Sequence, residues 1–260
     1  MPTFLFDRII FGPVKSRRLG VSLGINLLPA TKKLCNFNCI YCECGWTFDT
    51  SKERSNLPER DEIFKALEQK LSDLKEKNRP PDVITFAGNG EPTLHPDFPG
   101  IVDDCIELRN KYFPKARIAV LSNSSTITIP RVKEALLKVD QNILKLDSGF
   151  DLTVRVHNQP RVNIKVAELI SNLKSFNGQL IIQTLFLRGS FNGKVINNTT
   201  PGEIETWLKA IDMIKPYEVM IYTISRDTPE EGQLAKVPLA ELKRIAALVK
   251  RLGIKTSVSG

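Results

Sequence analysis

"KLCNFNCIYCECGW", residues 33–46, holds four of the chain's five cysteines. Cys35, Cys39 and Cys42 have the spacing C-x3-C-x2-C, and Cys44 follows two residues later. Disulfides between residues so close in sequence would close very small, strained loops. In a reducing compartment, clustered cysteines are more often metal ligands or catalytic thiols than disulfides. The stretch therefore predicts a metal or iron–sulfur site.

Two kinds of metal site fit these residues. A structural zinc ion takes four protein ligands, which the four cysteines would formally supply. Iron–sulfur clusters are also held by thiolates, and three cysteines on a four-iron cluster would leave one iron open for a substrate or cofactor. The residues alone do not decide between these two sites.

Length and composition indicate a globular protein with a sizeable core. The chain has 260 residues, of which 42% are hydrophobic and 25% charged. We expect a single domain over residues 1–260, with residues 1–20 as an N-terminal extension and residues from about 236 to 260 as a C-terminal helix–strand element. The first residues lack a signal-peptide pattern, and no run reaches the ~18 apolar residues of a membrane helix. We therefore expect a cytoplasmic protein with no membrane partner.

Short apolar runs alternate with amphipathic segments along the whole chain, which is typical of an α/β protein with a parallel sheet. Residues 188–202 are rich in turn-forming residues and are expected to be either a mobile flap or only a long connection. Periodicity alone does not separate an open doubly wound sheet from a full or partial β/α barrel. The expected strands cover residues 21–28, 82–88, 117–123, 142–147, 179–187 and 217–224, with a short seventh strand near the C-terminus.

Polar segments follow these strands, and the cysteine stretch follows the first of them. "GNGEPTLHP" follows the second strand, "SNSST" the third and "DSGFD" the fourth. In parallel α/β folds, functional residues gather just beyond the carboxyl ends of the strands. We therefore expect the cysteine stretch and these segments to meet at one rim of the sheet.

The cysteine spacing, with Tyr41 one residue before Cys42, resembles the signature of the radical S-adenosylmethionine (SAM) superfamily. "GNGEPTLHPDF" (residues 88–98) is similar to that superfamily's Gly-Gly-Glu motif, with Gly90 and Glu91 matched and Asn89 in place of a glycine. The resemblance covers most of the chain. It is nearest to a group of short iron–sulfur oxidoreductases related to wybutosine-type tRNA-modifying enzymes, and more distant from glycyl-radical-enzyme activases. It implies a partial (β/α)6 radical-SAM barrel.

The same resemblance implies the cofactors and partners. Cys35, Cys39 and Cys42 would bind a [4Fe–4S] cluster whose open iron chelates SAM. An electron donor such as flavodoxin or ferredoxin would supply one electron, and reductive cleavage of SAM would yield a 5′-deoxyadenosyl radical that abstracts hydrogen from a substrate. The basic ends of the chain, rather than the resemblance, make a tRNA the first candidate substrate. A small metabolite, or a protein activated by the radical, is the alternative.

The resemblance also implies a set of SAM-binding residues. Glu91 would accept a hydrogen bond from the methionine ammonium, and Lys145 and Asp147 would hold the carboxylate and ribose. Each has a structural alternative: a cap at Glu91, a strand-end ion pair for Lys145 and Asp147, and a core amide at Gln183. The full set is Tyr41, Gly88, Asn89, Gly90, Glu91, Ser122, Asn123, Lys145, Asp147, Gln183, Tyr222 and Thr223.

The net charge of +8 is concentrated near the two ends of the chain. A basic surface attracts anionic partners such as RNA, although lysine-rich surfaces are often only solvated. Arg17, Arg18 and Arg226 are the predicted substrate-binding residues. If RNA is the substrate, then Lys243, Arg244, Lys250 and Arg251 should also flank the open rim of the barrel.

Three classes of function remain open: a radical SAM enzyme, an electron carrier that uses the cluster alone, and a zinc-stabilised nucleic-acid-binding module. Neither of the last two requires the Glu91 motif or a barrel-like alternation of strands and helices. Those two features therefore favour the enzyme. Cys44 is expected to be a bystander and Cys105 a core residue.

Overall fold

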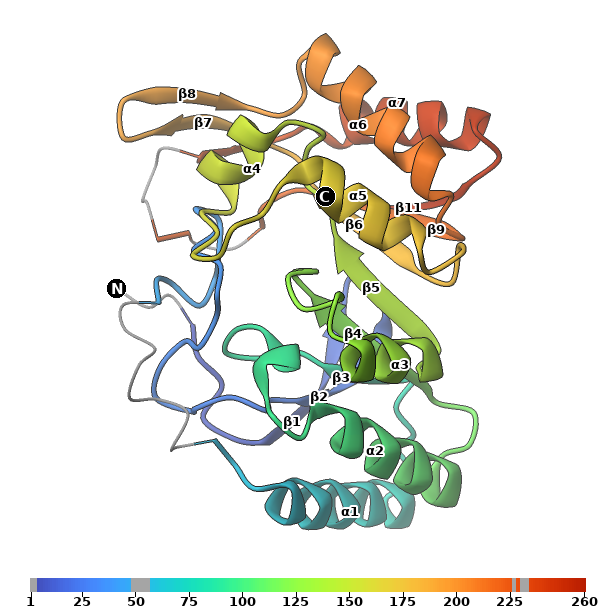
Figure 1. The fold of residues 1–260 in the computed structure, drawn as a ribbon. Coiled ribbons are helices and arrows are strands. Elements are labelled where there is room, and N and C mark those ends of the chain that lie inside the picture. The colour runs from blue at the N-terminus through green and yellow to red at the C-terminus, as the bar shows by residue number, and fades with distance from the viewer. Residues whose placement is uncertain (1–3, 48–56, 226–227, 230–233) are drawn as a thin grey trace.

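An eight-stranded curved sheet forms the framework of the computed structural model, which describes residues 4–47, 57–225, 228–229 and 234–260 (Figure 1). Its strand order is β1-β2-β3-β4-β5-β6-β9-β11. The strands from β2 onward run parallel, whereas β1 pairs antiparallel with β2. The strands are β1 (Ile10–Ser16), β2 (Gly20–Ile25), β3 (Val83–Phe86), β4 (Arg117–Ser122), β5 (Gln141–Lys145), β6 (Ile181–Leu185), β9 (Glu218–Tyr222) and β11 (Lys255–Ser259).

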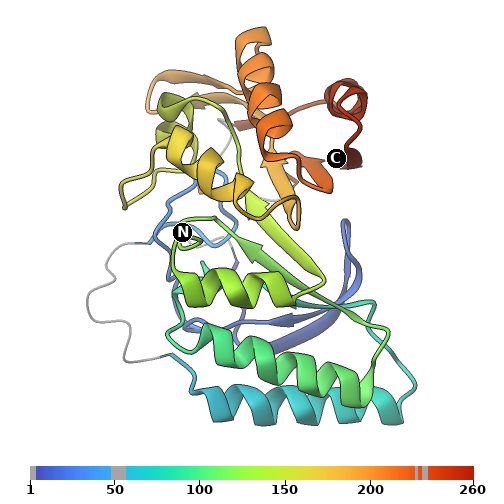
Figure 2. The ribbon, with the colours of Figure 1, turned by 45° about the vertical axis from the view of Figure 1, so that its right-hand side comes forward.

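Helices follow the parallel strands and cover the outer face of the sheet, which confirms the predicted partial β/α barrel. Figure 2 shows the first three long helices packed side by side beneath one half of the sheet. A shorter helix, α4 (Asp151–His157), follows β5 and lies on the side of the cysteine stretch. The covering helices are α1 (Arg60–Glu76), α2 (Phe98–Tyr112), α3 (Pro130–Lys138), α5 (Val166–Lys174), α6 (Pro201–Ile214) and α7 (Leu239–Arg251).

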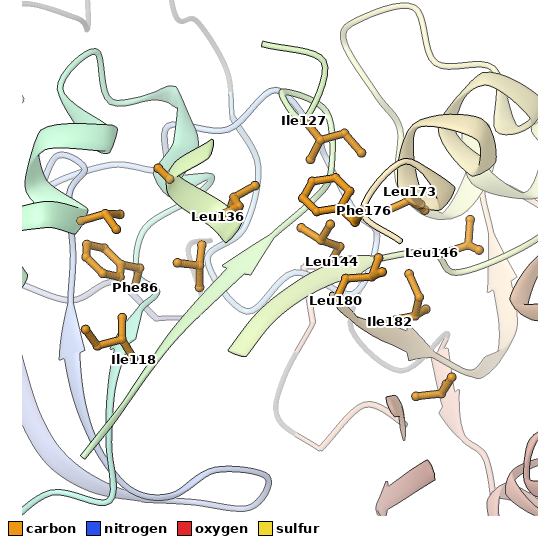
Figure 3. Close-up of a cluster of buried hydrophobic side chains, with 14 of the residues drawn as sticks. Phe86, Ile118, Ile127, Leu136, Leu144, Leu146, Leu173, Phe176, Leu180 and Ile182 are labelled. Carbon is orange, nitrogen blue, oxygen red and sulfur yellow. The ribbon is translucent and has the colours of Figure 1, made fainter. Parts of the chain in front are cut away.

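The main hydrophobic core lies between the sheet and its helices. Alternate residues of each strand, such as Phe86 on β3 and Ile118 on β4, point outward into this layer. They meet apolar helix residues such as Leu136 on α3 and Leu173 on α5 (Figure 3). The strands are apolar on both faces at this level, which explains their nearly continuous apolar runs in the sequence.

The inner face of the barrel changes from apolar to polar along the strands. At the amino ends, a small apolar cluster is closed by Leu19, which enters from the β1–β2 turn. Two residues further along, the inward positions carry Lys145, Gln183 and Tyr222, which lie near the carboxyl ends. The apolar cluster consists of Leu19, Val83, Ala119, Ile143, Ile181 and Met220.

The β1–β2 turn also spans the side of the barrel that strand pairing leaves open. Arg17 Nη1 donates a hydrogen bond to the Gly260 carbonyl (3.0 Å), just after β11. Arg18 Nη1 donates to Gln183 Oε1 on β6 (3.0 Å), and its guanidinium lies 4.4 Å from the ring centre of Tyr222 on β9. The segment expected to be an N-terminal extension thus contains a strand of the sheet and a turn that lies against the barrel interior.

The expected strand 179–187 is two strands, and the expected long connection 188–202 is a hairpin. β6 ends at Leu185, and β7 (Leu187–Phe191) pairs with β8 (Lys194–Asn197) and β10 (Leu234–Lys236) in a separate small sheet. Asn192 and Gly193 form the two-residue turn with φ of 49° and 72°. An Asn-Gly dipeptide between two short runs of strand-forming residues is a strong hairpin signal, so the sequence contained this information.

Replacing Leu19 with alanine should leave a void at the closed end of the barrel, because its side chain is only 4% exposed. A buried Leu→Ala substitution costs about 2–5 kcal/mol of unfolding free energy. Leu252→Ala is the matched control, since Leu252 is 38% exposed. Urea unfolding of the protein without added metal measures both. Equal stability of the two variants would contradict a packed role for Leu19.

Candidate functional site

The cysteine stretch is held against the carboxyl end of β3. Leu34 N donates to the Asn89 carbonyl (2.8 Å), and Glu91 N donates to the Leu34 carbonyl (3.1 Å). Gly90 lies between these contacts with a φ of 143°, and a Cβ atom there would lie 1.8 Å from the Leu34 oxygen. Only glycine accommodates this close approach.

A second segment, residues 157–161 just after α4, clamps the cysteine stretch from the other side. Phe37 and Pro160 form an antiparallel bridge. Three backbone hydrogen bonds continue this contact: Ile40 N to the His157 carbonyl, Asn38 N to the Gln159 carbonyl, and Arg161 N to the Asn36 carbonyl. The stretch has little regular structure of its own, so these contacts determine where its thiols point.

The thiols of the predicted ligands are surrounded by N–H donors. Cys35 Sγ lies 3.4 Å from Phe37 N and 3.6 Å from Asn123 Nδ2. Cys39 Sγ lies 3.5 Å from Asn158 Nδ2. N–H groups directed at sulfur favour the thiolate, the form in which cysteine binds metals.

Burial and hydrogen bonding move the pKa values of the thiols in opposite directions. Burial raises the pKa of Cys35 to about 12 and also raises that of Cys39. Hydrogen bonding from Cys44 lowers the pKa of Cys42 to about 5. Buried thiols that resist ionisation in the apo protein lose their protons to solvent when a cationic metal centre binds.

The arrangement fits a multi-iron cluster. No group of three or more His, Cys, Asp or Glu side chains among the described residues is arranged to hold a single metal ion. In a four-iron cluster each thiolate binds a different iron, so the sulfur atoms need not converge on one point. Two nearly buried thiols, a half-buried third and the N–H donors beside them suit such a group.

Glu91 caps the short 3-10 helix η2 (Pro92–Leu94). Its Oε1 accepts from Thr93 N (3.2 Å) and Thr93 Oγ1 (2.6 Å), and its Oε2 accepts from Asn123 N (2.6 Å). Burial raises the pKa of Glu91, and these hydrogen bonds oppose the rise. The capping role is therefore observed, and cofactor binding by Glu91 remains a prediction.

Asp147 is the centre of a buried network beside Cys39. Its Oδ2 accepts from the Tyr41 hydroxyl, from Asn158 Nδ2 (2.7 Å) and from Lys145 Nζ (3.4 Å), and its Oδ1 accepts from Leu185 N (2.9 Å). Burial favours the neutral acid, but Lys145 and these donors hold the pKa of Asp147 below its usual value. The ion pair weighed from the sequence therefore exists, and it fixes the Tyr41 ring over the Lys145 ammonium.

The other predicted cofactor residues lie at the same rim. Asn89 is fixed by Asn26 Oδ1, and a Cβ on Gly88 would lie 2.3 Å from that atom. Ser122 Oγ accepts from Ser124 N (3.1 Å), and Thr223 Oγ1 accepts from Val237 N (3.0 Å). Gln183 and Tyr222 contact Arg18, as described above. No contact with SAM is tested by these observations, so the cofactor assignments stay predictions.

A cavity of about 600 Å³ opens on the inner face of the barrel. Strand residues of its wall include Ser22 and Thr85, whose hydroxyls are 2.8 Å apart. The aromatic rings of Phe4, Phe6 and Phe11 form another wall, and Lys15, Arg17 and Arg18 line it with positive charge. Of the three predicted substrate arginines, Arg17 and Arg18 line this cavity, and Arg226 lies outside the described residues.

Two residues of the site had no prediction from the sequence. Asn158 contacts Cys39, Tyr41 and Asp147 at once, but it follows a short helix and carries no motif. Lys33 is only 4% exposed, which is unusual for a lysine. Its position two residues before the first cysteine was the available signal. Cys105 is fully buried in the core, as expected, and Cys44 Sγ donates to the Gly88 carbonyl (3.5 Å).

Comparisons with known proteins identify the family of this chain. The sequence model of the Radical SAM superfamily matches residues 32–231. The UPF0026 protein of Methanocaldococcus jannaschii is 35% identical over 183 residues, covering 69% of this chain and 54% of its own length. A Brachyspira hyodysenteriae protein named GTPase Obg is 32% identical over 85% of this chain and 31% of its own length. The chain thus spans about a third to a half of these curated relatives.

Among solved structures, a radical SAM methyltransferase from Sphaerobacter thermophilus is similar in fold, with a TM-score of 0.67 and 14% identity over 92% of this chain and 65% of its own. The chain belongs to the radical SAM superfamily, whose cofactors are a [4Fe–4S] cluster and SAM. Within the part of the chain that the structure describes, no helix is both long and apolar enough to cross a membrane.

Anaerobic reconstitution should load four irons and four sulfides per chain if Cys35, Cys39 and Cys42 are the ligands. Alanine at any of these positions should lower the iron content strongly. Cys44→Ala and Cys105→Ala are the matched controls and should retain the iron content of the parent. Metal analysis that found stoichiometric zinc and no iron after reconstitution would refute the assignment.

Proposed function

We propose that this enzyme cleaves SAM reductively and uses the resulting 5′-deoxyadenosyl radical to abstract hydrogen from an anionic substrate. One observation carries the proposal: the arginine-lined cavity on the inner face of the barrel reaches the cysteine stretch, because Glu43, the residue after Cys42, lines it. When bound, the cluster and SAM supply the one-electron chemistry. The protein has to hold, orient and shield them.

Different residues around the thiols would hold different parts of SAM. Glu91, fixed by Thr93 and Asn123, provides a buried carboxylate for the methionine ammonium of SAM. Lys145 provides a buried ammonium for the methionine carboxylate. Burial disfavours its charge, but Asp147 reverses this effect and raises the pKa of Lys145, so that it stays protonated. Tyr41, held by Asp147, offers a ring face beside this group.

Arg18 is the main candidate for anchoring the substrate. Gln183 and the Tyr222 ring hold its guanidinium in place at the wall of the cavity, so little conformational entropy is lost when a ligand binds. A guanidinium suits carboxylate or phosphate groups, which it binds with two parallel hydrogen bonds. The cavity of about 600 Å³ is large enough for a small metabolite or a single nucleotide.

A tRNA is the specific substrate candidate. The net charge of +8 and the cationic cavity wall favour a polyanion. Only some of the basic residues that were expected to flank the open rim of the barrel lie near it. Helix α7 leads into β11, so Lys250 and Arg251 in its last turn lie toward the amino ends of the strands, away from the cysteine stretch. Arg17 and Arg18 therefore carry the RNA proposal.

The proposed electron donor is a flavodoxin or ferredoxin, because one-electron reduction of the cluster needs a low-potential protein partner. The proposed location is the cytoplasm, where reduced thiols persist. All five cysteines are free in the structure.

The variant Glu91→Gln should keep four irons per chain but bind SAM about ten- to a hundredfold more weakly. Losing a charge-assisted hydrogen bond costs roughly 1.5–3 kcal/mol. Thr93→Val is the matched control, because it removes one hydrogen-bond donor to Glu91 but leaves the carboxylate charge. Equilibrium binding of SAM measures both variants. An unchanged dissociation constant in a folded Glu91→Gln protein would show that Glu91 is only a cap.

If tRNA is the substrate, its affinity should fall steeply as salt rises, because each neutralised phosphate releases counterions. Arg17→Gln and Arg18→Gln should each weaken binding, whereas Lys250→Gln, at the far end of α7, should not. A filter-binding series against salt concentration measures this. Weak binding of tRNA to the parent even at low salt would remove the RNA candidate and leave a small anionic substrate.

A further inference from the structure

Lys33 has a buried ammonium inside the cysteine stretch. The residue is 4% exposed, and its Nζ donates to the Gly45 carbonyl at 2.8 Å. Gly45 in turn closes the turn that carries Cys42, because its N–H donates to the Cys42 carbonyl at 3.0 Å. The ammonium is thus fixed at the turn that presents the third predicted ligand.

A buried ammonium needs a negative partner, since removing an unpaired charge from water costs far more than one hydrogen bond to a carbonyl returns. Within the described part of the chain, no carboxylate forms an ion pair with Lys33. Lys33 lies beside the predicted ligands instead: Cys35 is two residues further along the chain, and Gly45, which accepts from Lys33 Nζ, donates its N–H to the Cys42 carbonyl. Cysteines bind metals as thiolates, so the charge of the cluster ligands is the negative charge that this geometry brings to Lys33.

We infer that Lys33 is the charge-compensating residue of the cluster and makes the bound cluster easier to reduce. The inference rests on the proposed cluster ligands. Reduction adds one negative charge to a group that already carries three thiolates. A fixed positive charge at the ligand turn lowers the energy of the reduced state more than that of the oxidised state. Lys33 therefore raises the reduction potential and helps the electron donor.

Three variants distinguish the effect of the Lys33 charge from the effect of its side-chain shape. Lys33→Gln retains a donor for the Gly45 carbonyl but removes the charge. Lys33→Arg keeps the charge. Lys65→Gln is the control, because it removes an equal charge from the exposed side of α1, where solvent and salt screen it. Each protein is reconstituted anaerobically, its iron is counted, and its cluster is titrated with a reductant while the reduced form is followed by electron paramagnetic resonance.

Lys33→Gln should hold four irons per chain and show at least a tenfold smaller equilibrium constant for reduction, which is a shift of about 59 mV to lower potential for one electron. Lys33→Arg and Lys65→Gln should titrate like the parent. A fully loaded Lys33→Gln protein with the parent's potential would overturn the inference, while its iron content would still support the ligand assignment.

Loss of the cluster is also decisive. If Lys33→Gln fails to retain iron and Lys33→Arg retains it, the positive charge is required by the cluster site, as inferred. If neither variant retains iron, the site needs the shape of lysine rather than its charge, and the inference fails. The failure of the cysteine assignment itself would appear differently, as absence of iron in the reconstituted parent.

Discussion

The site depends on one constraint: a segment without regular structure has to hold three thiols in fixed positions. Residues 34–44 contain no helix and no full strand. Their conformation comes from neighbours: the end of β3 holds Leu34, and residues 157–161 hold residues 36–40. The segment after β3 and residues 157–161 are both anchored in the barrel. The sheet therefore holds the thiols in fixed positions. Gly90 makes this possible, since any side chain there would separate β3 from the cysteine stretch.

The inner face of the barrel is apolar at the amino ends of the strands and polar at their carboxyl ends. The apolar end stabilises the fold, and the polar end carries the predicted site. The amino ends meet in an apolar cluster closed by Leu19, whereas the carboxyl ends carry Lys145, Asp147 and Gln183. Buried charges are costly unless they are paired or hydrogen-bonded. Asp147 pairs with Lys145, and the Glu91 carboxylate accepts hydrogen bonds. Lys33 donates to the Gly45 carbonyl beside the predicted cluster ligands. These buried charges are therefore stable only while every one of these ion-pair and hydrogen-bond partners is present.

Strand–helix alternation is a local pattern, and it was sufficient to predict the α/β class. The resemblance to the radical SAM superfamily predicted the partial barrel, which the structure confirms. The ligand role of the cysteines stays a prediction. The sequence was less informative where a role depends on a distant partner. Asn158 is unremarkable in sequence and becomes important only because α4 carries it to Cys39. Lys33 looks like a surface residue until the cysteine stretch folds around it. The hairpin at Asn192 and Gly193 did have a local signal, and a turn-based interpretation would have found it.

Formation of 5′-deoxyadenosine from SAM by the reduced, reconstituted protein tests the central claim most directly, because it requires the cluster, the SAM site and their correct relative placement at once. The account predicts slow formation of 5′-deoxyadenosine and methionine in equal amounts by the parent protein. It predicts none from a Cys39→Ala variant under the same conditions. A fully loaded parent protein that binds SAM but forms no 5′-deoxyadenosine under strong reduction would contradict the account.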